Sequence, residues 1–365
     1  MRLDWNRIIS TLPGAHVLQT WEWGEVKAQF GWRPFARLWH NADGVVEAAA
    51  MILERTVRLP GSRTGLRILY VPRGPMLCTW EDQNLRRRVL RDLRQLAIDR
   101  NAIFIKIDPE VIQGKGISDS NTNEKEVHAR KLNQELIAEG WRSSTEQVQF
   151  RNTIVVDIRP EPDEILARMK QKTRYNIRLA ERKGVTVRFG GPQDIDLLYH
   201  MYAETALRDG FAIRERLYYQ LVWETFHNAN MADFLIAEIG DKPLAAVIVL
   251  RFAGKAWYMY GMSTDLHREK MPNHLLQWRA MLKARQEGCH AYDMWGAPDI
   301  FDPSAEMWGV FRFKEGFGGE VVRYIGAWDM PVRSGIYVFY HRIMPRFFAW
   351  LRFRGRLQTR SSLMN

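Results

Sequence analysis

The chain repeats one order of secondary structure, and this duplication constrains its fold more than any other feature. Hydrophobic patterning predicts a β-hairpin, a strand, a helix and a strand, over residues 35–58, 67–71, 82–99 and 102–107. The same order returns over residues 233–252, 256–260, 272–286 and 291–295. Tyr70 and Tyr258 are 188 positions apart, and Asp108 and Asp293 are 185 apart. Near-equal offsets predict a duplicated α/β unit.

A helical region separates the two copies. A strand is predicted at 153–158, a long basic helix at 162–183 and a further helix at 195–206. Because heptad repeats are absent, we expect no coiled-coil arm. The length of 365 residues suits two domains. We predict a mixed α/β fold with domains at 1–150 and 151–335, followed by a basic, aromatic tail at 336–365.

The order of these elements is typical of acetyltransferase-like (GNAT-like) folds. Their donor site lies where two central strands splay apart, above the start of the helix that connects them. A coenzyme A enzyme of this kind holds the pyrophosphate with backbone N–H groups of a glycine-rich loop. The corresponding segments here, residues 268–273 and 75–82, contain no glycine, and Pro272 removes one N–H donor. This argues against coenzyme A as the donor.

Composition limits the environment and the partners. The two cysteines, Cys78 and Cys289, do not form a Cys-x-x-Cys pair, and no HExxH motif is present, so we expect neither a zinc site nor a disulfide framework. No apolar run approaches the length of a membrane span. The net charge of +11 fits an anionic partner such as nucleic acid or a phosphate-bearing substrate, and plain solubility equally well.

The predicted helix at 162–183 carries a row of cations. Lys170, Arg174, Arg178 and Arg182 follow one another at a spacing of four residues. Such a row without interleaved acids can follow the phosphates of a nucleic acid. A solvated helix face is an equally good interpretation.

Two further segments combine charged and aromatic side chains. At 310–324, a predicted β-stretch precedes Gly316, Gly318 and Gly319, and Lys314 alternates with Phe313, so one of the two faces a cleft. A lysine in a cleft can stabilise an oxyanion, although a surface position is the ordinary interpretation.

At 208–219, Arg214 and Tyr218 are neighbours if the segment is helical, which suits phosphate or carboxylate recognition as well as simple helix capping. The tail at 336–365 mixes aromatic residues with cations. It can rest on an anionic bilayer or pack beneath the second domain.

Taken in order, these segments resemble one family almost from end to end. The stretches that carry the resemblance are LQTWEWGEVKAQFGW (18–32), YVPRGP (70–75), IKIDP (105–109), KTRYNIRLAERKGV (172–185), TALRDGFAIRERLYY (205–219), MPNHLLQW (271–278), YDMWGAP (292–298) and FRFKEGFGGE (311–320). The chain resembles the Fem-type (FemABX) peptidoglycan-bridge aminoacyltransferases. The family's fold, two tandem acetyltransferase-like domains, agrees with the duplication.

The resemblance implies a reaction. Such enzymes move an amino acid from aminoacyl-tRNA to an amine of the peptidoglycan stem peptide, carried by lipid II or by the UDP-linked muropeptide. The donor is an activated ester, so the reaction needs neither a cofactor nor a covalent enzyme intermediate. It needs deprotonation of the acceptor amine, a positive partner for the oxyanion and a proton for the departing oxygen. We expect a cytoplasmic monomer that can contact the inner membrane face peripherally.

The resemblance also assigns roles to residues. Lys314, with Phe313, resembles the family's donor-side pair, in the second domain. Lys27, Asp108, Arg214, Tyr218 and Tyr260 resemble its acceptor-binding positions, and the first domain is the acceptor side. Arg214 would bind the diphosphate, supported by Lys27, and Asp108 would contact the amine. Tyr258 remains an alternative to Tyr260. Without a coiled-coil arm, the basic helix with Lys170, Arg174, Arg178 and Arg182 is the candidate tRNA-binding element.

Two rival hypotheses remain. The first is an N-acyltransferase of the same fold that uses coenzyme A or another thioester in the modification of a cell-surface polymer. The second is a non-catalytic protein that binds tRNA or lipid II and has kept the fold. The retained Lys314 and the glycine-rich segment favour catalysis.

Overall fold

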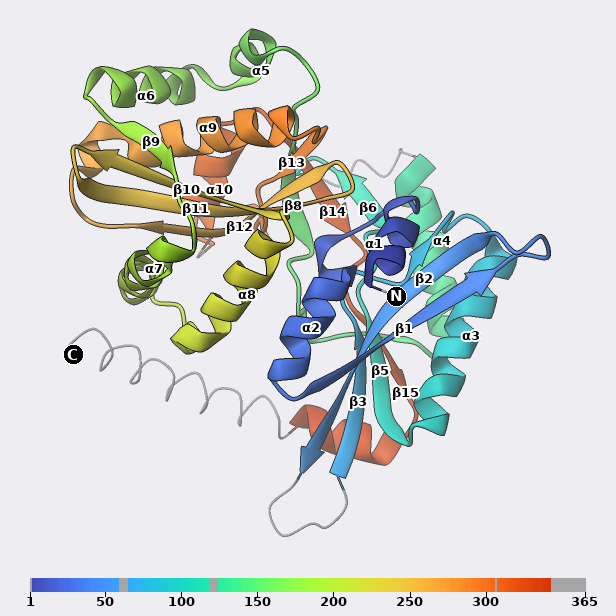
Figure 1. The fold of residues 1–365 in the computed structure, drawn as a ribbon. Coiled ribbons are helices and arrows are strands. Elements are labelled where there is room, and N and C mark those ends of the chain that lie inside the picture. Colours follow the sequence, from blue (N-terminus) through green and yellow to red (C-terminus); the bar gives the residue numbers. More distant parts are fainter. Residues whose placement is uncertain (1, 59–64, 118–123, 306, 343–365) are drawn as a thin grey trace. The chain divides into compact units, whose positions relative to one another are not determined.

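The structure is a computed structural model that describes residues 2–58, 65–117, 124–305 and 307–342 (Figure 1). It divides into two compact units. Within the described residues, the first unit comprises 2–153 and 321–342, and the second comprises 154–320.

The sequence prediction placed residues 321–335 in the second domain. The structure groups them with the first unit because β15 (Trp328–Pro331) pairs antiparallel with β5 (Ala102–Ile107). Trp328 and Met330 of β15 are buried in the core of that unit. The predicted tail can be described only as far as residue 342: residues 334–342 are helical, and the rest of the tail lies outside the described residues.

The first unit is built on a mixed sheet. Its strand order is β1 (Trp32–His40), β2 (Val46–Arg58), β3 (Gly65–Val71), β5, β15 and β7 (Arg142–Ser143), and β4 (Met76–Leu77) pairs with β2. The strands β6 (Ile112–Lys115) and β14 (Glu320–Tyr324) pair with each other. The predicted hairpin at 35–58 is therefore confirmed.

The helices of the first unit include α1 (Arg2–Ser10), α2 (Trp21–Gln29), α3 (Gln83–Asp99) and α4 (Glu124–Ala138), with a 3₁₀ turn, η1 (Val17–Gln19). Helix α3 matches its prediction. The Asp82 carboxylate accepts hydrogen bonds from the N–H groups of Asn84 and Leu85, which caps the first turn. Val89 and Leu93 are buried against the sheet, with Leu96 packed beside them.

The second unit repeats this plan. Its strand order is β8 (Asn152–Asp157), β13 (Ala291–Asp293), β12 (Lys255–Ser263), β11 (Lys242–Phe252), β10 (Ala232–Ile239) and β9 (Thr186–Phe189). Helix α9 (Pro272–Gln286) connects the parallel strands β12 and β13, as α3 connects β3 and β5. The duplicated order predicted from the sequence is therefore present in both units.

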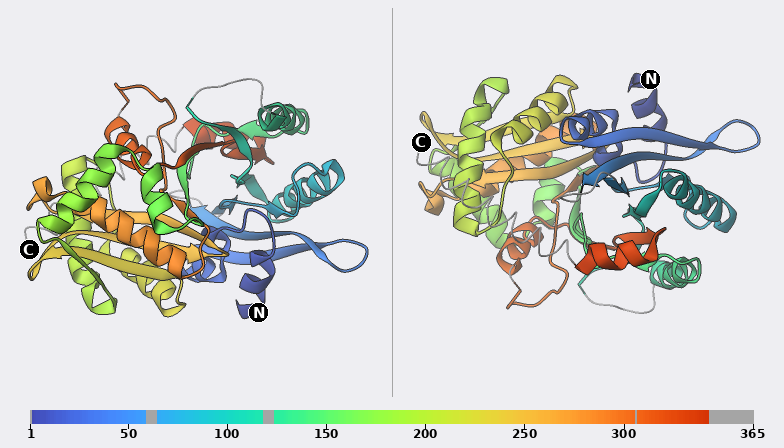
Figure 2. Two further views of the ribbon diagram at one scale, coloured as in Figure 1. Left: turned by 90° about the horizontal axis from the view of Figure 1, so that it is seen from above. Right: turned by 90° about the horizontal axis from the view of Figure 1, so that it is seen from below.

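Helices cover both faces of the second sheet. Helices α9 and α6 (Gln171–Arg182) lie on one face, and α7 (Ile195–Asp209) and α8 (Arg216–Asn228) lie on the other (Figures 1 and 2). The remaining elements are α5 (Pro162–Arg168), α10 (Trp308–Glu315) and the 3₁₀ turns η2 (Pro192–Asp194) and η3 (Arg268–Lys270). The helices between β8 and β10 are 7 to 15 residues long, so this described stretch contains no coiled-coil arm.

Two predictions about local structure were wrong. The predicted helix at 162–183 is two helices, because the backbone is extended at Met169 and Lys170 and the Lys170 N–H donates to the Gly316 carbonyl. The predicted β-stretch before Gly316 is helix α10. Phe311 and Lys314 lie three residues apart on its buried face, which is helical rather than strand spacing.

Among the described helices, none is long and apolar enough to cross a bilayer.

Candidate active site

In the second unit, the two central parallel strands stop pairing near the end of β13. Strand β12 pairs with β13 only from Lys255 opposite Ala291 to Trp257 opposite Asp293. Beyond this point β12 continues to Ser263, whereas β13 ends. The two strands therefore lose contact near the start of α9, which is where the sequence placed a donor site.

The ammonium group of Lys314 lies at this position. From α10, its Nζ donates hydrogen bonds to the carbonyl oxygens of Trp295 and of Gly296, the latter at 2.8 Å, just after β13. Nζ is also 5.8 Å from the centroid of the Tyr258 ring. Only 5% of Lys314 is exposed, and burial lowers its pKa to about 8, while the Asp293 carboxylate opposes part of that shift. The site therefore contains a desolvated cation.

The turn after β13 positions the two carbonyl oxygens that accept hydrogen bonds from Lys314. The Asp293 carboxylate accepts a hydrogen bond from the Trp295 N–H at 2.8 Å. Trp295 has a φ of 52°, in the left-handed region that non-glycine residues rarely adopt. In this conformation two successive carbonyl oxygens accept hydrogen bonds from the Lys314 ammonium group. Backbone strain of this kind is common at functional sites.

Phe313, the neighbour of Lys314, belongs to an aromatic cluster. Its ring centroid is 5.1 Å from that of His274 and 5.2 Å from that of Phe317. Nε2 of His274 lies 3.1 Å from the side-chain nitrogen of Asn176 and, because an amide nitrogen only donates, Nε2 is the acceptor. Burial and the nearby Lys172 ammonium lower the pKa of His274 to about 4, so the imidazole is neutral at neutral pH.

The glycines after α10 bring it close to the start of the unit. Gly318 has a φ of 77°, and a Cβ at this residue would lie 2.5 Å from the carbonyl oxygen of Arg168. A Cβ at Gly319 would lie 2.6 Å from a methyl group of Ile154. These glycines permit a close backbone approach that also positions α10 and Lys314.

We expect Gly318→Ala to lower the free energy of unfolding by about 2 kcal/mol, because it combines an unfavourable φ with a backbone clash. Thermal or denaturant unfolding measures this effect. Gly309→Ala is the matched control, because a Cβ there meets nothing within 4 Å and alanine favours the helix. Equal stability of the two variants would contradict the close approach at Gly318.

Three of the predicted acceptor-binding residues cluster around Tyr219. The guanidinium carbon of Arg214 lies 4.7 Å from the Tyr218 ring centroid, and the Tyr219 ring lies 5.3 Å from Tyr218 and 5.8 Å from Tyr260. Tyr218 and Tyr219 are buried, whereas Arg214 is exposed. Burial raises the pKa of the Tyr218 hydroxyl. An exposed guanidinium on a buried tyrosine platform is suited to an anionic ligand.

Arg214 and Tyr218 are in contact, although only Tyr218 belongs to a helix. Arg214 precedes α8, which begins at Arg216 after Glu215 at its N-cap. The chain entering the helix places the guanidinium on the Tyr218 ring of the first turn.

A β-bulge lies between Tyr258 and Tyr260, the two alternatives that the sequence left open. Tyr260 opposes Ile248 and Tyr258 opposes the next residue, Val249, so Met259 is an extra residue in β12. Tyr258 lies near Lys314, and Tyr260 lies in the cluster with Tyr219. The two side chains therefore have different surroundings and can serve different ligands.

The predicted row of cations does not behave as one unit. Nζ of Lys170 lies 2.6 Å from a Glu315 carboxylate oxygen. Arg174 donates to the carbonyls of Ala167 and Met169 at the end of α5. Both side chains fix the corner between α5 and α6, while Arg178 and Arg182 lie on the exposed face of α6.

In the first unit, the two central parallel strands stay paired to their ends. Strands β3 and β5 pair as far as Val71 opposite Ile107, the last residue of each strand. Directly after β5, the Asp108 carboxylate accepts hydrogen bonds from the Tyr70 hydroxyl at 2.7 Å and from the Arg73 N–H. The parallel strands of this unit thus leave no open splay at their ends.

Asp108 is itself buried, with 3% of its surface exposed. Burial raises its pKa to about 6, although the Arg73 cation and the Tyr70 hydrogen bond oppose the shift. A carboxyl group with this pKa can accept a proton near neutral pH.

Lys27, the remaining predicted acceptor-side residue, lies on α2. Its Nζ is 4.2 Å from the centroid of the Trp23 ring.

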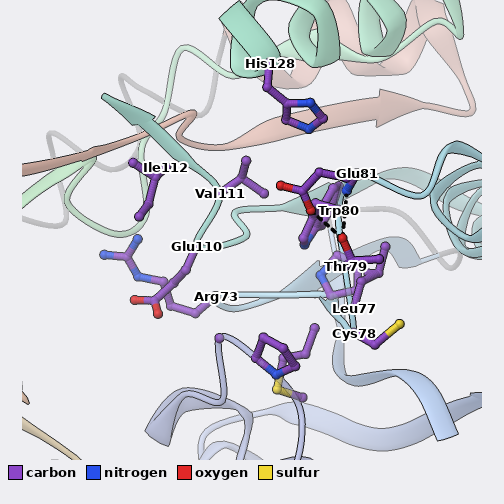
Figure 3. A pocket seen from close by; sticks show the side chains of 14 residues that line it. Arg73, Leu77, Cys78, Thr79, Trp80, Glu81, Glu110, Val111, Ile112 and His128 are labelled. Carbon is purple, nitrogen blue, oxygen red and sulfur yellow. Dashed lines mark hydrogen bonds between the residues drawn. The ribbon is translucent and has the colours of Figure 1, made fainter. Parts of the chain in front are cut away.

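The first unit also contains a cavity of about 530 Å³. It is lined by the segment before α3, by the segment after β5 and by His128 of α4 (Figure 3). Glu81 and Thr79 lie at one end beside His128, and Arg73 and Glu110 lie at the other. The Glu110 carboxylate is 3.7 Å from Nε2 of the buried His16. The cavity can therefore hold a small ligand with polar groups at both ends.

Comparison with known proteins identifies the family. The model of the FemAB family matches residues 4–242 and 238–344. The chain belongs to the FemAB family. A lipid II:glycine glycyltransferase of Staphylococcus aureus (strain USA300) is 24% identical over 408 residues, covering 93% of this chain and 94% of the relative. The corresponding protein of Staphylococcus haemolyticus is 23% identical over 406 residues, with the same coverage.

Solved structures agree on the fold. The crystal structure of FemX superposes with a TM-score of 0.80 at 20% identity, covering 93% of this chain and 98% of that one. L-PGS from Bacillus licheniformis superposes with a TM-score of 0.52 at 12% identity, covering 91% and 92% of the two chains. The mixed α/β fold with two sheets is therefore that of FemX, and the predicted family resemblance is confirmed.

Membership of the FemAB family makes the chain aminoacyltransferase-like. Within the described residues, no group of three or more His, Cys, Asp or Glu side chains is arranged to hold a metal ion. Lys314 and Asp108 are both buried, and their pKa values are shifted to about 8 and to about 6.

The sequence interpretation did not single out His274 or His128. His274 contacts Phe313, and it belongs to the stretch MPNHLLQW (271–278), which carries part of the family resemblance. His128 precedes Lys314 by 186 residues, and both lie on the helix that follows the second parallel strand of their unit. This separation of 186 residues lies between the offsets of 185 and 188 that relate the two repeats, so it is a sequence signal for His128 and not for His274.

Proposed function

We propose that this FemAB-family protein is a tRNA-dependent aminoacyltransferase. It transfers an amino acid from aminoacyl-tRNA to the stem-peptide amine of a peptidoglycan precursor, lipid II or its UDP-linked form. The buried Lys314 ammonium carries the proposal, because it lies at the splay of β12 and β13, where a fold of this type binds its acyl donor. The relatives named as lipid II:glycine glycyltransferases support the substrate class.

The segment that precedes α9 supports an aminoacyl donor over coenzyme A. It forms the 3₁₀ turn η3, without glycine, and Pro272 is the first residue of α9. His267 and Met271 on either side of η3 have positive φ values of 50° and 57°. This turn differs from a glycine-rich loop whose N–H groups surround a pyrophosphate.

In the proposed reaction, the acceptor amine attacks the ester carbonyl of the aminoacyl group. A C–N bond forms, the carbonyl oxygen becomes an oxyanion, and the bond to the ribose oxygen then breaks. The proton lost by the amine is balanced by the proton gained by the departing ribose hydroxyl. Lys314 stabilises the oxyanion as a cation, and Phe313 contacts the donor beside it.

We assign the acceptor to the other predicted residues. Asp108, with its raised pKa, accepts the proton of the incoming amine. Arg214 binds the diphosphate from its position on Tyr218, with Lys27 and Tyr260 as further contacts. The donor-side pair, Lys314 and Phe313, belongs to the second unit. We place the reaction in the cytoplasm, with peripheral contact at the inner membrane face and no cofactor.

A transfer assay tests the proposal. The purified protein is mixed with a pool of radiolabelled aminoacyl-tRNAs and with either lipid II or the UDP-linked pentapeptide, with and without prior RNase. We expect label on the precursor that is lost after RNase, and the labelled residue identifies the amino acid. Transfer from acetyl-coenzyme A to a surface-polymer amine, without transfer from any aminoacyl-tRNA, would instead establish the thioester alternative.

A further inference from the structure

The exposed face of α6 carries one aromatic ring between cations. Tyr175, Arg178 and Arg182 follow one another at spacings of three and four residues, so they share one side of the helix. The opposite side is buried through Thr173, Asn176, Ile177 and Ala180. Tyr175 is 55% exposed, and the guanidinium carbon of Arg182 lies 5.8 Å from its ring centroid.

A second exposed ring lies beside a groove of the same unit. Phe189, at the end of β9, is 60% exposed, and Nζ of Lys283 lies 5.4 Å from its ring centroid. The groove has a volume of about 650 Å³ and is lined by residues of α6, β9 and α9. Glu181 of α6 and Arg279 of α9 meet across it at 3.1 Å. Phe189 therefore borders this groove, whereas Tyr175 lies on the exposed side of α6. We call Tyr175, Arg178, Arg182, Phe189 and Lys283 the α6–β9 surface.

The cations around α6 divide by what they contact. Lys170 and Arg174 are held by Glu315 and by backbone carbonyls, as described above. Lys172, Arg178 and Lys183 form no ion pair with any described residue. The single acid of α6, Glu181, is already paired with Arg279. The exposed face of the helix therefore retains a surplus of positive charge.

This pattern fits unpaired nucleotides better than the other anionic partners. A base stacks on an exposed aromatic ring whatever its identity, and cations beside the ring contact the phosphates. A base-paired stem would use the cations but not the rings. An anionic bilayer would need a continuous apolar face to insert, whereas the exposed side of α6 carries one ring, Tyr175, beside the cations Arg178 and Arg182.

We propose that the α6–β9 surface binds unpaired nucleotides of the RNA donor, with Tyr175 and Phe189 as stacking rings and Arg178 and Arg182 at the phosphates. The proposal rests on the proposed function for the identity of the RNA. It adds the elements and the two aromatic residues that recognise it.

Fluorescence anisotropy with a labelled RNA hairpin tests the surface directly. One hairpin has a single-stranded 3′ tail, and a second has the same stem with a blunt end. We expect Tyr175→Ala and Phe189→Ala each to weaken binding of the tailed hairpin by about fivefold or more, and to leave the blunt hairpin unchanged. Arg178→Gln should weaken both hairpins and reduce the dependence of the affinity on salt.

Two controls separate stacking from folding. Tyr175→Phe keeps the ring and is expected to keep wild-type affinity. Ile300→Ala removes an exposed apolar side chain, 71% exposed, from the same unit and should leave the affinity for RNA unchanged. In the transfer assay, Tyr175→Ala should raise KM for aminoacyl-tRNA while kcat changes little.

The outcomes also separate this inference from the proposed function. RNase-sensitive transfer together with wild-type RNA affinity of both alanine variants overturns the α6–β9 surface and leaves the proposed function standing. Binding of the tailed hairpin that depends on Tyr175 and Phe189, without any transfer, supports the surface and overturns the proposed reaction. Loss of binding to phosphatidylglycerol vesicles in the alanine variants, with unchanged RNA affinity, assigns the surface to lipid and overturns the inference.

Discussion

Lys314→Met is expected to lower kcat for aminoacyl transfer by about 100- to 1,000-fold. The substitution removes the cation that we assign to the oxyanion, and one such electrostatic contact typically contributes that much. The methionine keeps the length of the side chain and its buried stem, so α10 should retain its position. Single-turnover kinetics with purified aminoacyl-tRNA measure the effect, and Arg312→Gln, an exposed neighbour on α10, is the matched control.

The wild-type rate should fall as pH rises through about 8. The protonated form of Lys314 stabilises the oxyanion, and its pKa is lowered from 10.5 to about 8. The same shift affects stability with a definite sign. Between about 8 and 10.5 the unfolded chain holds the proton that the folded chain has lost, so the free energy of unfolding should rise with pH over that interval. An unchanged kcat in Lys314→Met, or a rate independent of pH between 7 and 9, would contradict the role of this residue.

Asp108→Asn is expected to lower the rate of transfer by about 100-fold, because the amide cannot accept the proton of the acceptor amine. In the wild-type protein the rate should rise with pH through about 6, where the Asp108 carboxyl loses its proton. Together with Lys314 this predicts a bell-shaped pH profile with limbs near 6 and 8. The variant should lose the acidic limb and keep the alkaline one.

Stability provides an independent measure of Asp108. Its pKa in the folded chain is about 6, above the ordinary 3.8. Between these values the folded state holds a proton that the unfolded state has lost, so the free energy of unfolding should fall as pH rises from about 4 to 6. Asp108→Asn should abolish this dependence. If the pH–rate profile of Asp108→Asn keeps its acidic limb, a group other than Asp108 is responsible for that limb.

The periodic and capped elements were predictable from the sequence. The helix predicted over residues 272–286 has these bounds in the structure, and Pro272 is its first residue. Asp82 predicted the start of α3 in the same way. The signals are local, because a cap or an apolar stripe acts within a few residues.

Local patterns misled where a distant segment decides the conformation. In residues 310–315, apolar and charged side chains alternate as in a strand, and Gly309 lowers helix propensity. The helix forms because Phe311 and Lys314 are buried together. Similarly, nothing within 162–183 predicts the break at Lys170, whose N–H bonds to Gly316.

The sequence by itself determined the duplication, the two acetyltransferase-like units and the family, because offsets and motifs are properties of residue order. It also named Lys314 and Asp108. Only the tertiary structure decided that Lys314 is desolvated beside the Gly296 carbonyl, and that Tyr258 lies near Lys314 while Tyr260 contacts Tyr219. It also showed that Lys170 and Arg174 fix the corner between α5 and α6, whereas Arg178 and Arg182 lie on the exposed face of α6. Burial and hydrogen-bond partners depend on segments that are distant in the sequence, and these determine which charges remain available for chemistry.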